Sequence, residues 1–156
     1  MTEGGAPQSV LFCCDHNAVR SPMAEGLARR FYGSEIFVQS AGVHNDLEID
    51  GFAIAVCKEA NVSLDRHRSR SFEEMKEWGD DLSSYDLIIA LSPASQRLAL
   101  ELTRYAHIDV EYWPILDPTG MGESRAAKLD AYRQTRDQIV ERLVQRFGKP
   151  RTKNQK

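Results

Sequence analysis

A cysteine and an arginine carry the clearest chemical signal in this chain. Cys14 follows an apolar run at residues 10–13, Arg20 stands six positions later, and Pro22 opens a helix-like pattern. A helix N-terminus presents unpaired N–H groups and positive potential, and inward-pointing loop amides add further donors. Such a cradle stabilises a thiolate, and a guanidinium matches a phosphate or similar oxyanion. The stretch 14–21 therefore predicts covalent phosphoryl transfer, with Cys14 as nucleophile and Arg20 as clamp.

Alternating strand and helix patterns supply the scaffold for this loop. Strands are predicted at residues 9–13, 36–39 (stopped by Ser40-Ala41-Gly42), 85–91 and 108–113. Helices are predicted at residues 21–33, 51–60, 93–104 and 125–147. This order predicts a three-layer α/β fold, a four-stranded parallel sheet flanked by helices on both faces. Because ligands bind beyond the carboxyl ends of such strands, Cys14 and Asp117 are expected at one edge of the sheet.

Composition and charge narrow the class of protein. The chain has 156 residues, 42% of them hydrophobic, and a net charge of −3 at pH 7. These values fit a single globular domain, predicted over residues 9–147 with flexible tails at 1–8 and 148–156. No stretch approaches the roughly 20 apolar residues of a membrane span, and the polar first residues are not expected to be a secretory signal. A cytoplasmic location is expected, without a membrane or nucleic-acid partner.

The three cysteines are expected to be free thiols in a reducing compartment. Cys13 and Cys57 have apolar neighbours and are interpreted as inert core residues. No spacing typical of a zinc site occurs among the cysteines and histidines. We therefore expect neither a metal nor a cofactor.

Further motifs follow the loop in order. The motif C-x5-R-S-P is followed by M-A-E-G, by Ser40-Ala41-Gly42, by His67-Arg68-Ser69-Arg70, by Tyr85-Asp86-Leu87-Ile88 and by Asp117-Pro118. This set resembles the low-molecular-weight protein tyrosine phosphatase family, whose fold and loop thioredoxin-coupled arsenate reductases share. The resemblance covers about residues 9–147, nearly the whole chain.

The resemblance implies a role for each matching residue. Cys14 would be the nucleophile, Arg20 the oxyanion clamp, and Asp117 the general acid that protonates the leaving oxygen. The other residues that bind the oxyanion would be Asp15, His16, Asn17, Ala18, Val19 and Ser21. A supporting hydrogen-bond network would join Asn17 and Ser21 to Ser40 and His67. Asparagine suits a tightly curled loop because it tolerates positive φ.

The loop departs from the family pattern at three positions. His16 replaces the usual glycine, and Asp15 places a carboxylate beside the cradle, where an inward orientation would weaken phosphate binding. Val19 stands where many members carry a second cysteine, so a protective disulfide with Cys14 is not expected. In addition, no aromatic residue follows Ser40-Ala41-Gly42 or Asp117-Pro118, where the family often places the walls of its tyrosine pocket.

Three functions are compatible with these observations, in descending order of preference. The first is hydrolysis of a phosphomonoester, with a phosphotyrosyl protein or a small aryl phosphate as substrate and inorganic phosphate as product or inhibitor. The second is reduction of arsenate with an external thiol, because residues 91–102 lack the relay cysteines of thioredoxin-coupled reductases. The third is a non-catalytic module that binds phosphate or a phosphoprotein, although Cys14, Arg20 and Asp117 are all present.

Overall fold

A parallel sheet of four strands forms the centre of the computed structural model, which describes residues 7–150. The strands are β1 (Ser9–Cys14), β2 (Phe37–Gly42), β3 (Leu87–Ala90) and β4 (Asp109–Tyr112), in the spatial order β2-β1-β3-β4. The helices are α1 (Arg20–Tyr32), α2 (Gly51–Lys58), α3 (Phe72–Glu77), α4 (Pro93–Leu102) and α5 (Arg125–Phe147), with a 3-10 turn η1 (Leu82–Ser84). The predicted α/β fold class is confirmed.

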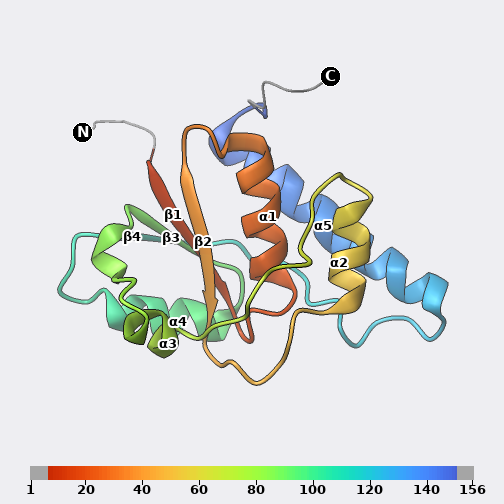
Figure 1. The fold of residues 1–156 in the computed structure, drawn as a ribbon, viewed down its shortest axis with the longest axis horizontal. Coiled ribbons are helices and arrows are strands. Elements are labelled where there is room, and N and C mark those ends of the chain that lie inside the picture. The colour runs from red at the N-terminus through yellow and green to blue at the C-terminus, as the bar shows by residue number, and fades with distance from the viewer. Residues whose placement is uncertain (1–6, 151–156) are drawn as a thin grey trace.

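Helices cover both faces of the sheet (Figure 1): α1, α2 and α5 pack on one face, and α3 and α4 pack on the other. Side chains alternate along β1, as they do in any strand. Phe12 and Cys14 therefore face α1, whereas Leu11 and Cys13 face the opposite layer. The two adjacent cysteines belong to different cores, and only Cys14 lies on the face of the following helix.

The expectation that Ser40-Ala41-Gly42 ends the second strand is wrong. These residues belong to β2, and Gly42 pairs with Cys14 in the register of β1. A Cβ atom on Gly42 would lie 2.7 Å from the backbone N of Asn17 and 2.8 Å from the backbone C of His16. The glycine is needed for the close approach of the loop after β1 and does not terminate the strand.

We expect Gly42→Ala to lower the free energy of unfolding by about 1–3 kcal/mol, because backbone atoms cannot make room for the added methyl group. Urea denaturation measures this loss. Gly51→Ala is the matched control, since a Cβ there meets nothing within 4 Å and its helical position favours alanine. A Gly42→Ala protein as stable as the parent would show that the loop yields at this point.

Between β2 and β3 the structure contains two short elements that the sequence analysis did not predict. Helix α3 begins with a capping box, in which Ser71 and Glu74 each bond the other's backbone N–H. The turn η1 is capped by the side chain of Asp81. The spacing Ser-x-x-Glu is the signal that could have located α3.

The two ends of the chain, before β1 and after α5, are only partly described. Residues 1–6 and 151–156 of the predicted flexible tails lie outside the described residues. Within the described part, the backbone N–H of Gln8 donates to Asp86, and the carbonyl of Gly148 accepts from the Tyr32 hydroxyl. Among residues 7–150, no helix is long and apolar enough to cross a membrane.

Candidate active site

The loop of residues 15–19 joins β1 directly to α1, so Cys14 ends the strand and Arg20 begins the helix. Asn17 has a φ of 53°, a left-handed conformation that asparagine adopts more readily than most residues. Two backbone hydrogen bonds tie the loop to the segment after β2: His44 N–H donates to the carbonyl of Asp15, and Asp50 N–H to that of Ala18. The loop is thereby held in a curled form around the start of α1.

The Cys14 sulfur is buried at the start of α1, with 2% of the residue exposed. Its Sγ atom lies 2.9 Å from Oγ of Ser21 and 3.3 Å from the backbone nitrogen of Ser21. In the thiolate form the sulfur would accept from both groups at the positive end of the helix dipole. This arrangement suits a nucleophile that later departs as a thiolate.

The side chain of Asn17 connects the loop to β2 and to the segment of residues 67–70. Its Nδ2 donates to Oγ of Ser21 at 2.8 Å and to Oγ of Ser40 at 2.9 Å. Its Oδ1 accepts from Nε2 of His67 at 3.1 Å and from the backbone nitrogen of Arg70 at 3.0 Å. The four residues expected to form a supporting network are therefore brought together. Arg70 also takes part, through a backbone contact that the residue type does not reveal.

Glu25 is a further member of this network that the sequence analysis did not single out. Its Oε1 accepts from the Ser40 hydroxyl and lies 3.8 Å from Nδ1 of His67, while Arg29 pairs with Oε2. Because Oδ1 of Asn17 can only accept, Nε2 of His67 carries the proton in the neutral ring. His67 thus braces Asn17 from behind the loop and does not line the pocket that contains Cys14.

The burial of His67 predicts that stability falls in mild acid. Burial lowers its pKa, so below the unfolded value of about 6.5 the unfolded chain binds the proton first. The free energy of unfolding then rises with pH between the folded pKa and about 6.5, by at most about 1.4 kcal/mol per pH unit. Denaturation in urea at several pH values measures this slope.

His67→Gln, which keeps an N–H donor, should remove most of this slope. The matched control is His107→Gln, because His107 is exposed and its loss should leave the slope as it is. A slope that persists in His67→Gln would assign the acid sensitivity to another group.

Arg20 is buried, with 7% of the residue exposed, and it points across the loop. Its Nη1 donates to the carbonyl oxygens of Leu91 at 3.3 Å and Ile115 at 3.1 Å, which follow β3 and β4. Its Nη2 lies 3.6 Å from Oδ2 of Asp15 and 3.7 Å from Oδ2 of Asp117. The backbone of two strand ends therefore fixes the guanidinium, and two carboxylates face its free side.

Asp15 faces the site, the orientation in which its carboxylate competes with a phosphate for Arg20. Its Oδ1 is buried without a hydrogen-bond partner among the described residues. A carboxylate in this position repels an anion that enters the pocket, and it also lies within ion-pair distance of Arg20. Asp15 therefore adds negative charge to the loop beside Arg20.

Asp117 reaches the loop from the far end of the chain. Its Oδ1 accepts from the backbone nitrogen and the hydroxyl of Thr119, at 3.1 and 3.0 Å. Its Oδ2 faces Arg20, and the side chain is 48% exposed. One oxygen is held and the other faces the pocket, which is the orientation that a proton donor to a bound ester requires. Thr119 could have been inferred from Asp-Pro-Thr, since aspartate commonly bonds the backbone two residues on.

These groups line a pocket of about 280 Å³ at the carboxyl end of the sheet. Leu47, Glu48, Asp50 and Thr119 complete a wall that the loop residues and Asp117 begin. No Phe, Tyr or Trp belongs to this lining. The pocket therefore combines one guanidinium with several carboxylates and a single exposed aliphatic side chain, Leu47.

The remaining loop residues and cysteines have defined positions. Nδ1 of His16 lies 2.6 Å from Oδ1 of Asp46, which draws the imidazole toward the segment after β2, and Val19 lines the pocket. Cys13 and Cys57 are buried free thiols. Burial raises the pKa of Cys13 and raises that of Cys57 to about 12. Both are thus inert core thiols, and within residues 7–150 no cluster of side chains suits a metal ion.

Comparisons with known proteins agree with this geometry. A family model, low molecular weight phosphotyrosine protein phosphatase, matches residues 9–156. The chain is 29% identical to a glutaredoxin arsenate reductase of Synechocystis sp., over 91% of this chain and 98% of the relative. It is also 29% identical to a protein-arginine-phosphatase of Bacillus subtilis, over 87% and 92% of the two chains.

A solved structure supports the same assignment. An arsenate reductase in the phosphate binding state superposes with a TM-score of 0.70 at 27% identity, covering 88% of this chain and 95% of that one. The curled loop between β1 and α1, the parallel sheet and the family match all lead to one assignment. The chain belongs to the low molecular weight phosphotyrosine protein phosphatase family.

Proposed function

We propose that this protein hydrolyses phosphomonoesters through a cysteinyl-phosphate intermediate. The observation that carries the proposal is the convergence of Cys14, Arg20 and Asp117 on one pocket. Arg20 is held by two backbone carbonyls, so its Nη2 is directed at the position where an oxyanion would replace the carboxylates of Asp15 and Asp117. A fixed donor of this kind stabilises charge that develops on a transferring phosphoryl group.

In the first half-reaction the Cys14 thiolate attacks phosphorus and the ester P–O bond breaks. The leaving oxygen takes a proton from Oδ2 of Asp117, so that a neutral alcohol or phenol departs. Arg20 and the loop N–H groups bind the equatorial oxygens during this step. The product of the half-reaction is a thiophosphate ester on Cys14.

In the second half-reaction the Asp117 carboxylate takes a proton from water, which attacks phosphorus while the S–P bond breaks. The thiolate is regenerated beside the Ser21 hydroxyl and backbone N–H, both within 3.3 Å of the sulfur. These contacts stabilise the sulfur as a leaving group. Inorganic phosphate is released, and no metal or cofactor takes part in either step.

A phosphotyrosyl protein or a small aryl phosphate is the proposed substrate class. The family match supports this choice, and Leu47, 52% exposed at the pocket wall, offers apolar contact to a phenyl ring. The wall lacks the aromatic stacking surface of a deep tyrosine pocket, so we expect weak discrimination among aryl groups. The acidic lining also favours leaving groups that bear no negative charge near the phosphate.

A second candidate is arsenate reduction with an external thiol, because arsenate reductases are among the similar proteins. Cys14 would displace water from arsenate to form a thiol adduct. An external thiol would then attack the Cys14 sulfur and break its bond to arsenic, so that the bond's electron pair reduces As(V) to As(III). A second external thiol would cleave the resulting mixed disulfide, which restores Cys14 and leaves the two external thiols as a disulfide. Cys13 and Cys57 are buried with raised pKa values, so neither is suited to an internal relay.

One preparation assayed for both reactions tests the proposal. We expect hydrolysis of p-nitrophenyl phosphate that is insensitive to a metal chelator, and little reduction of arsenate with glutathione and glutaredoxin or with thioredoxin. Arsenate reduction that exceeds the phosphatase turnover would select the second candidate. Binding of inorganic phosphate without either reaction would identify a non-catalytic phosphate-binding module.

A further inference from the structure

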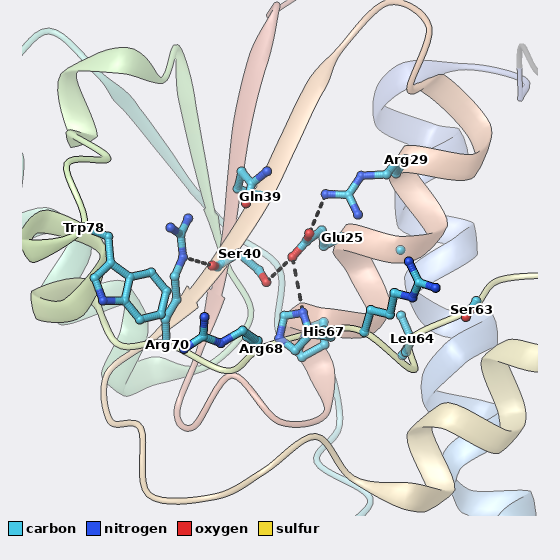
Figure 2. Close-up of a pocket in the computed structure, with 13 residues that line it drawn as sticks. Glu25, Arg29, Gln39, Ser40, Ser63, Leu64, His67, Arg68, Arg70 and Trp78 are labelled. Carbon is cyan, nitrogen blue, oxygen red and sulfur yellow. Dashed lines mark hydrogen bonds and ion pairs between the residues drawn. The ribbon is translucent and has the colours of Figure 1, made fainter.

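A second cavity lies beside the network that supports the loop. Its volume is about 500 Å³, and it shares no lining residue with the pocket of Cys14. Figure 2 shows Glu25, Ser40 and His67 near its centre, with Arg29 on one side and Arg68, Arg70 and Trp78 on the other. We call it the arginine pocket, after its lining residues Arg29, Arg66, Arg68 and Arg70.

Positive charge is concentrated in the arginine pocket. Four arginines and a single carboxylate, that of Glu25, belong to its lining, although the chain as a whole carries a net charge of −3. Glu25 is already engaged by Arg29 and by the Ser40 hydroxyl. His67 adds no compensating negative charge, since it is neutral or cationic at any pH. Asp80, outside the lining, pairs with Arg70, so the surplus positive charge of the cavity belongs to Arg66 and Arg68.

The four arginines differ in how they are bound. Arg29 donates to Glu25 and to the carbonyl of Val38, and Arg70 donates to Asp80 and to the carbonyl of Ser40. Arg66 and Arg68 are exposed and make no hydrogen bond or ion pair with the described residues. The guanidinium of Arg68 lies 5.2 Å from the ring centroid of Trp78. Two guanidinium groups at the cavity wall thus keep their N–H donors free for a ligand.

We propose that the arginine pocket is a second anion site, which binds a small phosphate-bearing molecule. Guanidinium groups bind phosphate oxygens in pairs of parallel hydrogen bonds, which suits Arg66 and Arg68. The volume is sufficient for a phosphate with an attached organic group. Trp78, 49% exposed, offers a flat apolar surface to such a group. The proposal does not depend on turnover at Cys14.

A short series of hydrogen bonds would link a ligand in the arginine pocket to the sulfur of Cys14. Ser40 and His67 line the cavity and both bond Asn17, which bonds Ser21, which in turn contacts Cys14. A continuous hydrogen-bond network would thus connect the ligand to the nucleophile. The proposed site therefore lies next to the residues that hold the loop and outside the pocket of Cys14.

The test follows the indole N–H signals of the full chain by NMR during titration with inorganic pyrophosphate and, separately, inorganic phosphate. The chain has two tryptophans, and Trp113→Phe assigns the signal of Trp78. We expect a saturable shift of Trp78, with the same apparent affinity in Cys14→Ser, where turnover is absent. A Trp78 signal that does not move, or that moves linearly with added salt, would overturn the proposal.

Variants at the two free arginines sharpen the test. Arg66→Glu/Arg68→Glu should weaken the Trp78 titration at least about tenfold, which corresponds to about 1.4 kcal/mol. Arg66→Gln/Arg68→Gln should give a loss in the same direction without reversing charge. The matched control is Arg97→Glu/Arg104→Glu, which makes the same change in net charge outside the pocket and should titrate like the parent.

Two further results would contradict the proposal. An unchanged titration in both Arg66/Arg68 variants would show that these arginines hold no ligand. An acidic peptide that saturates the Trp78 shift at lower concentration than pyrophosphate would assign the pocket to a protein segment. A lack of p-nitrophenyl phosphate hydrolysis would count against the proposed function alone, because the titration does not measure turnover.

Discussion

Cys14→Ser should lower kcat/KM for the hydrolysis of p-nitrophenyl phosphate by roughly 10⁵-fold or more, as the removal of other catalytic nucleophiles does. A serine hydroxyl does not ionise near neutral pH, and no second thiol can replace Cys14. Cys13 faces the helices on the opposite side of the sheet, and Cys57 is buried in α2. The measurement is kcat/KM at fixed ionic strength, together with the affinity for inorganic phosphate, which Arg20 and the loop should largely retain.

Cys57→Ala is the matched control for this variant, because it removes a buried thiol outside the pocket and should keep most of the activity. Alkylation gives an independent reading: iodoacetamide should inactivate the parent protein, and vanadate or phosphate should slow that inactivation. Undiminished turnover in Cys14→Ser would eliminate the covalent mechanism, whatever the outcome of the binding measurements.

Asp117→Asn should slow hydrolysis of a phosphate ester with a poor leaving group by about 10²–10⁴-fold, the usual contribution of general acid catalysis. Asparagine keeps the acceptor that Thr119 bonds but has no proton to donate to the departing oxygen. A nitrophenolate departs without protonation, so the loss with p-nitrophenyl phosphate should be much smaller. The measurement is kcat/KM across a series of aryl phosphates that differ in the acidity of the phenol.

The matched control for Asp117→Asn is Glu123→Gln, which removes one negative charge from the same connection between β4 and α5. Glu123 is exposed and does not line the pocket. The kcat/KM of Glu123→Gln should therefore depend on the leaving group in the same way as that of the parent protein. If Asp117→Asn loses the same factor with good and poor leaving groups, its carboxylate acts through the charge on Arg20 and not as an acid.

The two carboxylates that face Arg20 affect ligand binding as well as chemistry. An incoming phosphate must replace Oδ2 of Asp15 and Oδ2 of Asp117, which lie 3.6 and 3.7 Å from Nη2. The oxyanion gains hydrogen bonds from Arg20 but meets the charge of Asp15 at short range. Tight binding of free phosphate is therefore disfavoured, and in the proposed mechanism this would help product release after the second half-reaction.

The sequence by itself was sufficient for the architecture and the loop. Apolar runs alternating with helical patterns predicted the parallel sheet, which is confirmed, and C-x5-R-S-P located the loop between a strand and a helix. These signals are local: residues within one turn or one strand decide them, so the order along the chain is enough. Short capped elements such as α3 were missed because too few residues carry a periodic signal.

Only the tertiary structure decided how distant residues meet. Glu25 and the backbone of Arg70 join the network of Asn17, Asp15 turns toward Arg20, and β2 continues through Ser40-Ala41-Gly42 under the loop. The arginine pocket likewise assembles residues from α1 and from the segment before α3. Strand register and helix packing set these contacts, and both depend on the whole core, whereas residue types and spacing describe only the immediate neighbourhood of each side chain.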